Sequence, residues 1–462
     1  MFFNRRTGLG GIENTGLFRL LAPFCARRVG RPAKFELFEE EIYLVKVCDA
    51  IMGSGKTSAT INYINEHPEK RFIYITPYLA EAERIKQACP AADFIEPTNT
   101  EQHGFSKMNH TAELVKERRN IASTHKALSL YTPEMYQELK DAHYTVIIDE
   151  EVSVVEEDAG VNCDDISLMQ DAGYIEEVSP NEFALTEKGK QYSGGRLAKL
   201  VNRMRCQTLL LTSSSRATKT YYWKFSKELF SAADEVLVLT YLFDRSEMQM
   251  FFAISEIEYT NIGISYTPET GYQFCDHKDY IPPYVANLDQ MIMIEQRERL
   301  NEVGKNKTSL SMGWYQTRKV ELDELRRNIY NYFRNRADGS VDDRMCGTFK
   351  AHWGKIRGRG YWNSNVVFSQ NATNAYADKT VLAYPVNLFA SPSIVNFYRI
   401  HGQEFDNDRW ALSTMVQWIW RSAIRNGKQI QLYLPSRRMR ELLYKWIADT
   451  QEEYYERYGK ES

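Results

Sequence analysis

The sequence predicts an α/β protein in which parallel sheets are covered by helices. Two observations carry this prediction: from about residue 40, short β-rich runs alternate with longer helical patterns, and the apolar residues of these runs are continuous. Continuous apolar runs are expected of strands that are buried on both faces. At 462 residues the chain is too long for one ordinary hydrophobic core, so more than one domain is expected.

Strands and helices of the first half follow one another in regular order. Helical patterns lie at Ser58–Glu66 and Leu79–Ala88. Strands are predicted at Ile42–Val47, Phe72–Thr76, Thr145–Ile148, Thr208–Thr212 and Glu235–Thr240. Residues of about 160–203 interrupt this rhythm with an acidic helix, a strand, a turn and a strand. This order fits a small winged-helix-like unit or an ordinary loop-and-hairpin insertion.

A second α/β block is predicted further along the chain. It contains a long helix at Gln316–Asn335 and strands near Val366–Ser369, Val381–Tyr384 and Gln429–Tyr433. The expected organisation is a basic N-terminal extension at 1–35, a first domain at 36–240 that carries the insertion, a second domain at 241–445 and a polar tail at 446–462.

The charge of the chain is nearly balanced, with a formal net charge of −3, which does not mark a polyanion-binding protein. The basic residues are unevenly placed, however. The first 34 residues hold seven Lys and Arg but one acid, Glu13, which suits a transit peptide, a basic arm for nucleic acid or an extension without a role. Lys350–Trp362 interleaves basic and aromatic residues, which suits single-stranded nucleic acid or a basic loop over core aromatics.

Cysteine usage and hydropathy point to the cytoplasm. The seven cysteines are far apart and form no Cys-x-x-Cys pair, so we expect reduced thiols and no structural zinc. No stretch reaches the ~18–20 consecutive apolar residues needed to span a bilayer. A soluble cytoplasmic protein without a membrane partner is expected.

A phosphate-binding loop is predicted where the strand Tyr43–Val47 runs into the segment AIMGSGKT at 50–57 and then into a helix. Glycines let backbone N–H groups surround phosphates, the lysine neutralises the β- and γ-oxygens, and the threonine hydroxyl ligates Mg²⁺. The residues predicted to hold the nucleotide are Gly53, Ser54, Gly55, Lys56 and Thr57. This chemistry predicts a nucleotide phosphate and Mg²⁺ as the bound groups.

Two acids follow directly after a buried strand. Thr145–Ile148 ends at Asp149 and Glu150, and the carboxyl edge of a parallel sheet is where ligands bind. Asp149 is predicted to hold the magnesium ion together with Thr57. Glu150 is predicted to orient or deprotonate the attacking water.

The segments AIMGSGKT and IIDEEV, in this order, resemble the Walker A and Walker B motifs of superfamily 2 helicases, the DEAD/DEAH-like group. The resemblance implies two RecA-like domains in tandem with Mg-ATP between them. Phe72–Tyr78 resembles motif Ia, and Ile121–Leu128 resembles the next strand-contacting motif. Leu209–Ser214 resembles motif III, whose hydroxyls couple the ATP site to the nucleic-acid site. The nucleic-acid contacts implied in this half are Thr76, Pro77, Tyr78, Thr124 and His125.

The second block resembles the same family at motif VI. Gln417–Arg425 is similar to Gln-x-x-Gly-Arg-x-x-Arg, although Trp420 replaces the glycine and the second arginine comes one residue late. The resemblance implies that arginines here reach the γ-phosphate, and either Arg421 or Arg425 is the finger. Spacing of i, i+4 and i+8 would put Gln417 and both arginines on one helix face. Where motifs IV and V are expected, the implied nucleic-acid contacts are Asn371 and Thr373.

These features predict an ATP-dependent nucleic-acid helicase or translocase, most similar to the replication and recombination helicases of tailed bacteriophages. Single-stranded, tailed or branched DNA is the favoured partner, with RNA open and replication proteins as further partners. A phage protein would act in the cytoplasm of the infected host. Two other interpretations stay open: a terminase-like packaging motor, and a non-enzymatic nucleotide-dependent nucleic-acid-binding module.

Overall fold

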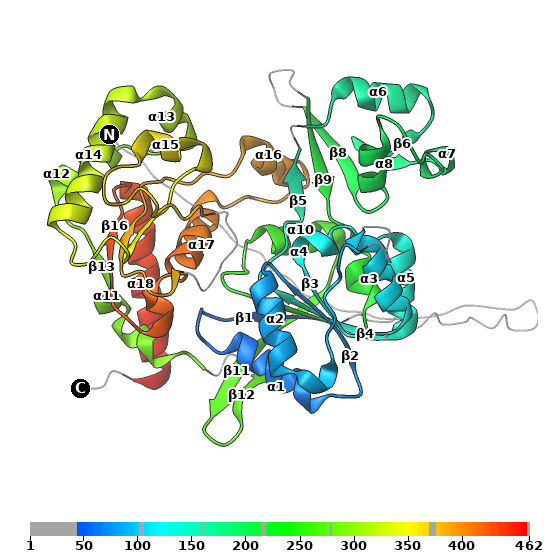
Figure 1. The fold of residues 1–462 in the computed structure, drawn as a ribbon, viewed down its shortest axis with the longest axis horizontal. Helices are drawn as coiled ribbons and strands as arrows, with labels where there is room; N and C mark the ends of the chain where they lie inside the picture. The colour runs from blue at the N-terminus through cyan, green and yellow to red at the C-terminus, as the bar shows by residue number, and fades with distance from the viewer. Residues whose placement is uncertain are drawn as a thin grey trace, which may run out of the picture. The chain divides into compact units, whose positions relative to one another are not determined.

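The computed structural model describes residues 44–100, 106–158, 160–213, 219–277, 280–368 and 376–459. The extension predicted at 1–35 and the contacts predicted for Asn371 and Thr373 lie outside them. The described residues form a seven-stranded, a five-stranded and a four-stranded sheet (Figure 1). The first and last are mainly or wholly parallel and the middle one is antiparallel, so an α/β fold with a small insertion is confirmed.

The first sheet has the order β12-β11-β1-β10-β4-β2-β3, and its neighbours are parallel except β11 and β12. The strands are β1 (Leu44–Asp49), β2 (Arg71–Thr76), β3 (Ile121–Thr124), β4 (Tyr144–Asp149), β10 (Glu235–Thr240), β11 (Tyr259–Thr267) and β12 (Gly271–Cys275). Because β11 pairs with β1, this sheet continues past residue 240 into the range predicted for the second block. The domain limits themselves stay a prediction.

Helices cover both faces of the first sheet, and side-chain alternation along β4 shows why. Val146 and Ile148 belong to one hydrophobic cluster with α5 and α10, whereas Ile147 belongs to another with α1 and α2. The sheet is therefore buried on both sides, as the continuous apolar runs predict. The helices of this half are α1 (Lys56–Glu66), α2 (Leu79–Ala88), α3 (Lys107–Lys116), α4 (His125–Leu128), α5 (Pro133–Ala142), α9 (Leu229–Ala232) and α10 (Glu247–Ser255).

The insertion is larger than the sequence predicts. Its sheet has the order β5-β9-β8-β7-β6 and recruits three strands from outside 160–203. Its elements are β5 (Val155–Glu157), α6 (Cys163–Asp171), β6 (Ile175–Ser179), β7 (Glu182–Leu185), α7 (Glu187–Lys190), α8 (Ala198–Met204), β8 (Thr208–Ser213) and β9 (Lys219–Lys224). The predicted helix, strand, turn and strand are present as α6, β6 and β7, as one part of this unit.

The strand predicted at Thr208–Thr212 exists, but its assignment to the parallel sheet is wrong. It is β8, which pairs antiparallel with β7 and β9 in the insertion. Its continuous apolar run arises because Leu209 lies in the hydrophobic core of the insertion while Leu210 lies in a core of the first half. Burial on both faces gives the same local pattern in either kind of sheet.

The second half is built on the parallel sheet β13-β16-β15-β14. Its strands are β13 (Ile292–Ile294), β14 (Arg344–Cys346), β15 (Val381–Ala383) and β16 (Ile430–Tyr433). The last two confirm predicted strands. The strand predicted at Val366–Ser369 is wrong for its described residues: 366–368 form no strand, and an isolated bridge joins Asn365 to Cys346 instead.

Two predictions for the second half differ from its helices in detail. Gln316–Asn335 is divided at Arg318, which ends α13 and precedes α14. The polar tail predicted from 446 is helical as far as Tyr458, and Trp446 and Ile447 are buried. The helices are α11 (Leu288–Met291), α12 (Glu298–Asn301), α13 (Met312–Thr317), α14 (Lys319–Asn335), α15 (Trp353–Ile356), α16 (Pro392–Ile400), α17 (Asn407–Ile419) and α18 (Arg437–Tyr458).

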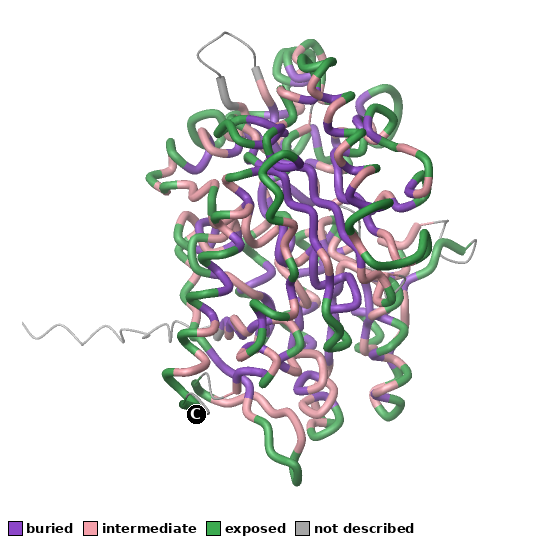
Figure 2. Tube along the Cα trace, turned by 90° about the vertical axis from the view of Figure 1, so that its left-hand side faces the viewer, coloured by how far each residue is buried: buried purple, intermediate pink, exposed green. Residues whose placement is uncertain are grey.

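One helix of the second half packs into a core of the first. Phe397 and Tyr398 of α16 belong to the hydrophobic cluster that also holds β4 and α5 residues. At the start of α16 the Ser391 hydroxyl donates to Glu157 Oε2 of β5 at 2.8 Å. Figure 2 shows buried residues running along the strands. None of the helices in the described part of the chain has the length and apolar composition that a membrane span needs.

Candidate functional site

The loop between β1 and α1 has the backbone that the glycine pattern predicts. Gly53 and Gly55 have φ values of 75° and 92°, in the left-handed region that favours glycine. A Cβ on Gly55 would lie 2.1 Å from Cδ1 of Tyr272 in β12, so a side chain there would clash with this ring. The Ser54 side chain is fully buried, and its backbone N–H donates to the Ile51 carbonyl at 3.2 Å.

Lys56 begins α1, and its ammonium group is directed at the loop. It donates to the carbonyl oxygens of Ala50 and Ile51, the latter at 3.2 Å. Burial lowers the pKa of Lys56, although nearby anionic groups including Asp149 oppose this effect. A partly desolvated cation whose partners in the described part of the chain are carbonyl oxygens is suited to receive phosphate oxygens, because these offer full negative charges.

Asp149 and Glu150 end the adjacent strand in different environments. Asp149 Oδ2 accepts a 2.7 Å hydrogen bond from the Tyr74 hydroxyl, and burial raises the pKa of this carboxyl. Glu150 has a φ of 63°, which is uncommon for a non-glycine residue, and its N–H donates to the Leu239 carbonyl at 2.9 Å. Burial and the neighbouring Asp149 raise the pKa of Glu150 to about 7. A carboxyl poised there exchanges protons readily near neutral pH.

A cavity of about 360 Å³ brings the predicted residues of both halves together. Its lining includes Gly53, Gly55, Lys56, Thr57, Tyr78, Asp149, Glu150, Gln417 and Arg425. Among these lining residues, the glycine loop, Lys56, the Thr57 hydroxyl and the carboxyls of Asp149 and Glu150 match the groups that hold a nucleotide with Mg²⁺. Among the described residues no cluster of three His, Cys, Asp or Glu side chains forms a further metal site.

The two arginines predicted as fingers occupy different places. The helix ends at Ile419, and Arg425 lies in the separate 3-10 helix Ala423–Asn426, so the shared helix face predicted for Gln417 and both arginines is wrong. Arg421 is buried and donates to the carbonyl oxygens of Val367 and Phe368, both at 3.2 Å. Arg425 is exposed and lines the cavity.

Three residues predicted to contact nucleic acid are buried or make contacts within the protein. Thr76 is fully buried, so its side chain is not accessible to a strand. The Tyr78 hydroxyl lies 3.4 Å from Glu150 Oε2. His125 Nε2–H donates to the Asp149 carbonyl oxygen at 2.9 Å, and burial lowers its pKa to about 4, so the ring is neutral near pH 7. Thr124 caps α4. The nucleic-acid contacts of Thr76, Pro77, Tyr78, Thr124 and His125 stay predictions.

The motif III assignment to Leu209–Ser214 is wrong in place, because β8 belongs to the insertion and not to the sheet that holds the phosphate loop. Between β1 and β4 lies β10, whose Thr240 hydroxyl donates to Glu151 Oε1 at 2.9 Å. Sequence reasoning missed this residue as a site candidate. The signal was available, since Thr240 is the polar residue at the end of an apolar strand, as Asp149 is. Other lining residues that were missed are Glu81, Arg84, Tyr241 and Tyr272.

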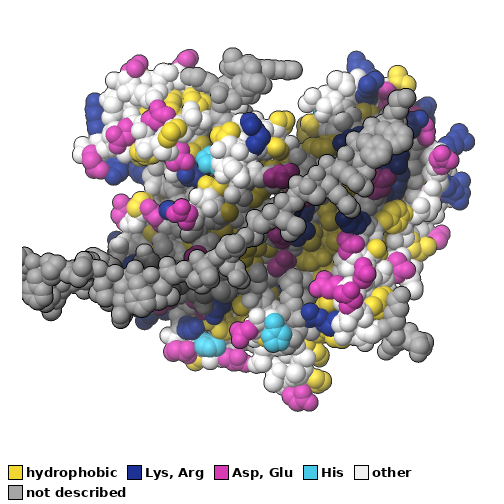
Figure 3. All heavy atoms as spheres, turned by 180° about the vertical axis from the view of Figure 1, so that it is seen from behind, with side chains coloured by type: hydrophobic (Ala, Val, Ile, Leu, Met, Phe, Trp, Pro, Cys, Tyr) yellow, Lys and Arg dark blue, Asp and Glu magenta, His cyan; other side chains and the backbone are white. Residues whose placement is uncertain are grey.

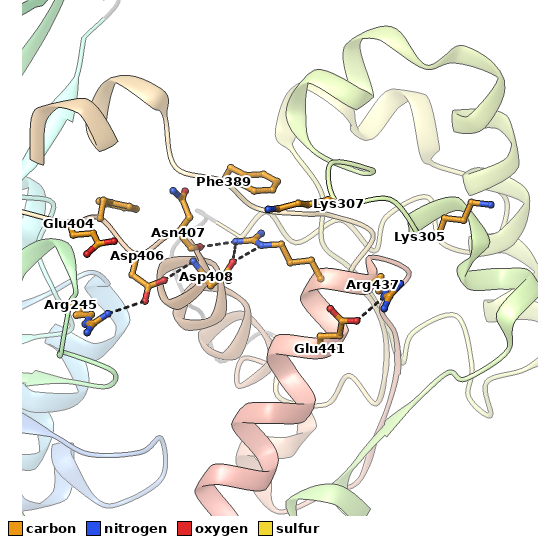
Figure 4. A pocket seen from close by; sticks show the side chains of 12 residues that line it. Arg245, Lys305, Lys307, Phe389, Glu404, Asp406, Asn407, Asp408, Arg437 and Glu441 are labelled. Carbon is orange, nitrogen blue, oxygen red and sulfur yellow. Dashed lines mark hydrogen bonds and ion pairs between the residues drawn. The ribbon is translucent and has the colours of Figure 1, made fainter. Parts of the chain in front are cut away.

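A wider cavity of about 800 Å³ lies at the amino-terminal ends of α17 and α18 (Figure 4). Its charges largely pair with one another: Arg438 with Asp408 at 2.7 Å, Arg437 with Glu441 at 2.7 Å, and Arg245 with Asp406 at 3.9 Å. Acidic and basic side chains are also mixed on the face in Figure 3. Matched charges do not favour a polyanion in this cavity.

Glu247 lies in a third cavity, of about 250 Å³, next to Glu151 and Gln417. Its Oε1 accepts a 3.0 Å hydrogen bond from Nε1 of Trp410 in α17, so it joins the two halves. Burial raises the pKa of Glu247 to about 7. Because the folded pKa exceeds that of the unfolded chain, its stabilising contribution is fully present at low pH and is lost as the pH rises through about 7.

Glu247→Gln should therefore raise the free energy of unfolding at alkaline pH but not at pH values near or below 4, where the carboxyl is protonated in both the folded and the unfolded chain. Glutamine keeps an acceptor for Trp410 and removes the buried charge, so the gain should be on the order of 1–3 kcal/mol. Thermal and denaturant unfolding across this pH range measure it, with Glu456→Gln on the exposed face of α18 as the control. An equal change at both pH extremes would contradict the titration of Glu247.

Together these features define a class: an α/β protein with parallel-sheet domains, a small antiparallel insertion and a phosphate-type loop facing two acids. Residues 286–447 match the family of the YonV C-terminal Rossmann-like domain. The chain is 32% identical over 413 residues to the SPbeta prophage-derived uncharacterized protein YonV of Bacillus subtilis (strain 168), covering 88% of this chain and 99% of that protein. The chain belongs to the YonV family.

Solved structures give a distant similarity. The S. tokodaii Xpd4 structure matches with a TM-score of 0.40 and 12% identity, covering 87% of this chain and 94% of that chain. An XPD helicase matches with a TM-score of 0.40 and 10% identity, covering 89% and 95%. At this distance the similarity concerns the arrangement of the chain alone.

Proposed function

We propose that this protein is an ATP-dependent nucleic-acid motor, a helicase or translocase that acts on DNA. The observation that carries the proposal is the 360 Å³ cavity, in which the phosphate loop and two acids of one half meet Gln417 and Arg425 of the other. A nucleotide bound there would contact both halves. Binding and hydrolysis could therefore change how the halves are held together, which is what a motor requires.

The side chains around the cavity suggest separate roles. The loop N–H groups and Lys56 hold phosphate oxygens, while Asp149 and Thr57 would hold Mg²⁺, which supplies charge neutralisation when it is bound with the nucleotide. Glu150 accepts the proton of the attacking water, and its raised pKa suits this exchange. Tyr74 orients Asp149 through their hydrogen bond.

Arg425 is the proposed finger, because this exposed residue lines the cavity whereas the Arg421 guanidinium donates to two carbonyl oxygens. Arg425→Ala should lower the rate of ATP hydrolysis about 10³-fold or more and leave the melting temperature unchanged. Arg421→Ala should instead cost about 1–3 kcal/mol of stability, since it leaves Val367 and Phe368 carbonyls without donors. Steady-state ATPase rates and thermal unfolding of both variants separate the roles. The opposite result would assign the finger to Arg421: a stable Arg421→Ala protein that no longer hydrolyses ATP, together with an Arg425→Ala protein that hydrolyses ATP at the wild-type rate.

The proposal is tested by ATP hydrolysis with and without single-stranded DNA, and by unwinding of 3′-tailed and 5′-tailed DNA and RNA duplexes. A DNA-stimulated ATPase that unwinds or translocates is expected. Nucleotide binding without turnover would favour a non-enzymatic binding module, and movement along duplex DNA without strand separation would favour a packaging motor. The proposed place of action is the cytoplasm of a bacterial host, in line with the prophage-derived relative.

A further inference from the structure

One long segment of the second half contains no acid. Residues 344–377 hold no Asp or Glu, although the whole chain has 61. The lysines and arginines of this segment are Arg344, Lys350, Lys355, Arg357 and Arg359. A run of positive charge without internal compensation is the local signature of a surface that meets a polyanion.

The part of this segment from Lys350 to Trp362, here called the basic loop, presents its charges to solvent. Lys350, Lys355, Arg357 and Arg359 are all exposed. In the described part of the chain, none of them forms an ion pair with a carboxylate; Lys355 donates to the Tyr315 carbonyl at 2.8 Å. The contrast with the 800 Å³ cavity is clear, because arginines there are paired with acids.

Buried residues and hydrogen bonds fix the conformation of the basic loop. Tyr361 is fully buried, and its hydroxyl donates to the Ile356 carbonyl at 2.6 Å. A Cβ on Gly358 would lie 2.7 Å from the Tyr361 oxygen, so the backbone fits closely over this ring. Arg344 donates to the Gly360 carbonyl at 2.5 Å. A loop anchored in this way loses little conformational entropy when it binds a partner.

Trp362, next to the buried Tyr361, points outward. It is 54% exposed, whereas the other tryptophans, all of them in the described residues, are buried or partly buried. The Arg357 guanidinium lies 3.9 Å from its ring centroid. An exposed tryptophan beside unpaired cations combines a stacking surface with phosphate-binding charge, the two contacts that single-stranded nucleic acid needs.

We propose that the basic loop binds single-stranded nucleic acid, with phosphates on its lysines and arginines and an unpaired base on the Trp362–Arg357 stack. The inference rests on the proposed function in taking nucleic acid as the partner. It assigns the contact to a surface apart from the nucleotide cavity, since no residue of the basic loop lines that cavity. A duplex would offer phosphates but no free base face, so single strands should bind more tightly.

Binding of labelled oligothymidylate, followed by fluorescence anisotropy on the full chain, tests the surface. Trp362→Leu should weaken binding about 5- to 100-fold, and Trp362→Phe should restore most of it, because an aromatic face is kept. Arg357→Glu should weaken binding most at low salt and make the salt slope shallower by about one. Lys445→Glu, the same charge change on the exposed face of α18, should bind as the wild type does.

Two further measurements make failure informative. Trp362→Leu should keep the basal ATPase rate and lose its stimulation by DNA, whereas Lys56→Ala should lose hydrolysis and keep DNA binding. Unchanged oligothymidylate affinity in a folded Trp362→Leu protein would overturn the inference and leave the proposed ATPase standing. Binding to blunt duplex DNA as tight as binding to oligothymidylate would overturn the inference. Binding to phosphatidylserine vesicles that depends on the basic loop, without binding to oligothymidylate, would overturn it in favour of another polyanion.

Discussion

Lys56→Ala should abolish ATP hydrolysis in a protein that remains folded. The ammonium group is the cation at the proposed phosphate loop, and among the described residues its hydrogen-bond acceptors are the Ala50 and Ile51 carbonyls. Removing a preorganised positive charge from a phosphoryl-transfer site costs at least about 10²–10³-fold in rate. The variant loses no buried ion pair at this position, so its thermal unfolding should match that of the wild type or improve slightly.

The measurement is steady-state phosphate release, with Mg-ATP binding followed by a fluorescent nucleotide analogue. Lys116→Ala removes an exposed lysine from α3 and serves as the control. Hydrolysis of ATP by Lys56→Ala at the wild-type rate would contradict the assignment of the phosphate loop. Unfolding of the variant would instead show that Lys56 stabilises the loop by its carbonyl contacts.

Glu150→Gln should bind Mg-ATP with near-normal affinity and hydrolyse it about 10²–10⁴-fold more slowly. A glutamine side chain keeps the shape of the glutamate but cannot accept the proton of the attacking water. The strained backbone at Glu150, with its φ of 63°, should persist, since its N–H bond to Leu239 does not involve the side chain. Glu83→Gln, exposed on α2, is the control and should hydrolyse normally.

The pH profile provides a second readout for the same residue. Burial raises the pKa of Glu150 to about 7, and only the ionised form accepts a proton, so kcat/KM of the wild type should rise from about pH 6 to about pH 8. The residual activity of Glu150→Gln should lose this rise. A rise retained unchanged in the variant would assign the titration to another group.

The backbone of the glycine loop at 50–57 and the place of the two acids after β4 could be predicted from the sequence because each is determined locally. A buried strand, a turn with glycine at positive φ and a helix follow one another without interruption at 44–66, and the acids follow β4 directly. Apolar runs, glycines and helix periodicity are properties of neighbouring residues. The α/β class follows from the same local patterns repeated along the chain.

Strand pairing was decided only by the tertiary structure. Leu209–Leu211 and Leu237–Leu239 read alike in sequence, yet β8 joins the antiparallel insertion while β10 lies between β1 and β4. The difference depends on which distant strands supply the hydrogen bonds and the opposing core. Because β10 and not β8 pairs with β4, the hydroxyl beside Glu151 is that of Thr240.

The roles of individual side chains were divided in the same way. The sequence by itself determined that Asp149 and Glu150 follow a buried strand and that Lys56 starts the helix after another strand. All three residues therefore lie at the carboxyl edge of a sheet. Only the fold decided that Arg421 is buried against carbonyl oxygens while Arg425 is open to the cavity, and that Trp362 is exposed while Tyr361 is buried. Hydrogen-bonded strand and helix geometry is local, whereas burial and partner choice depend on contacts between segments far apart in the chain.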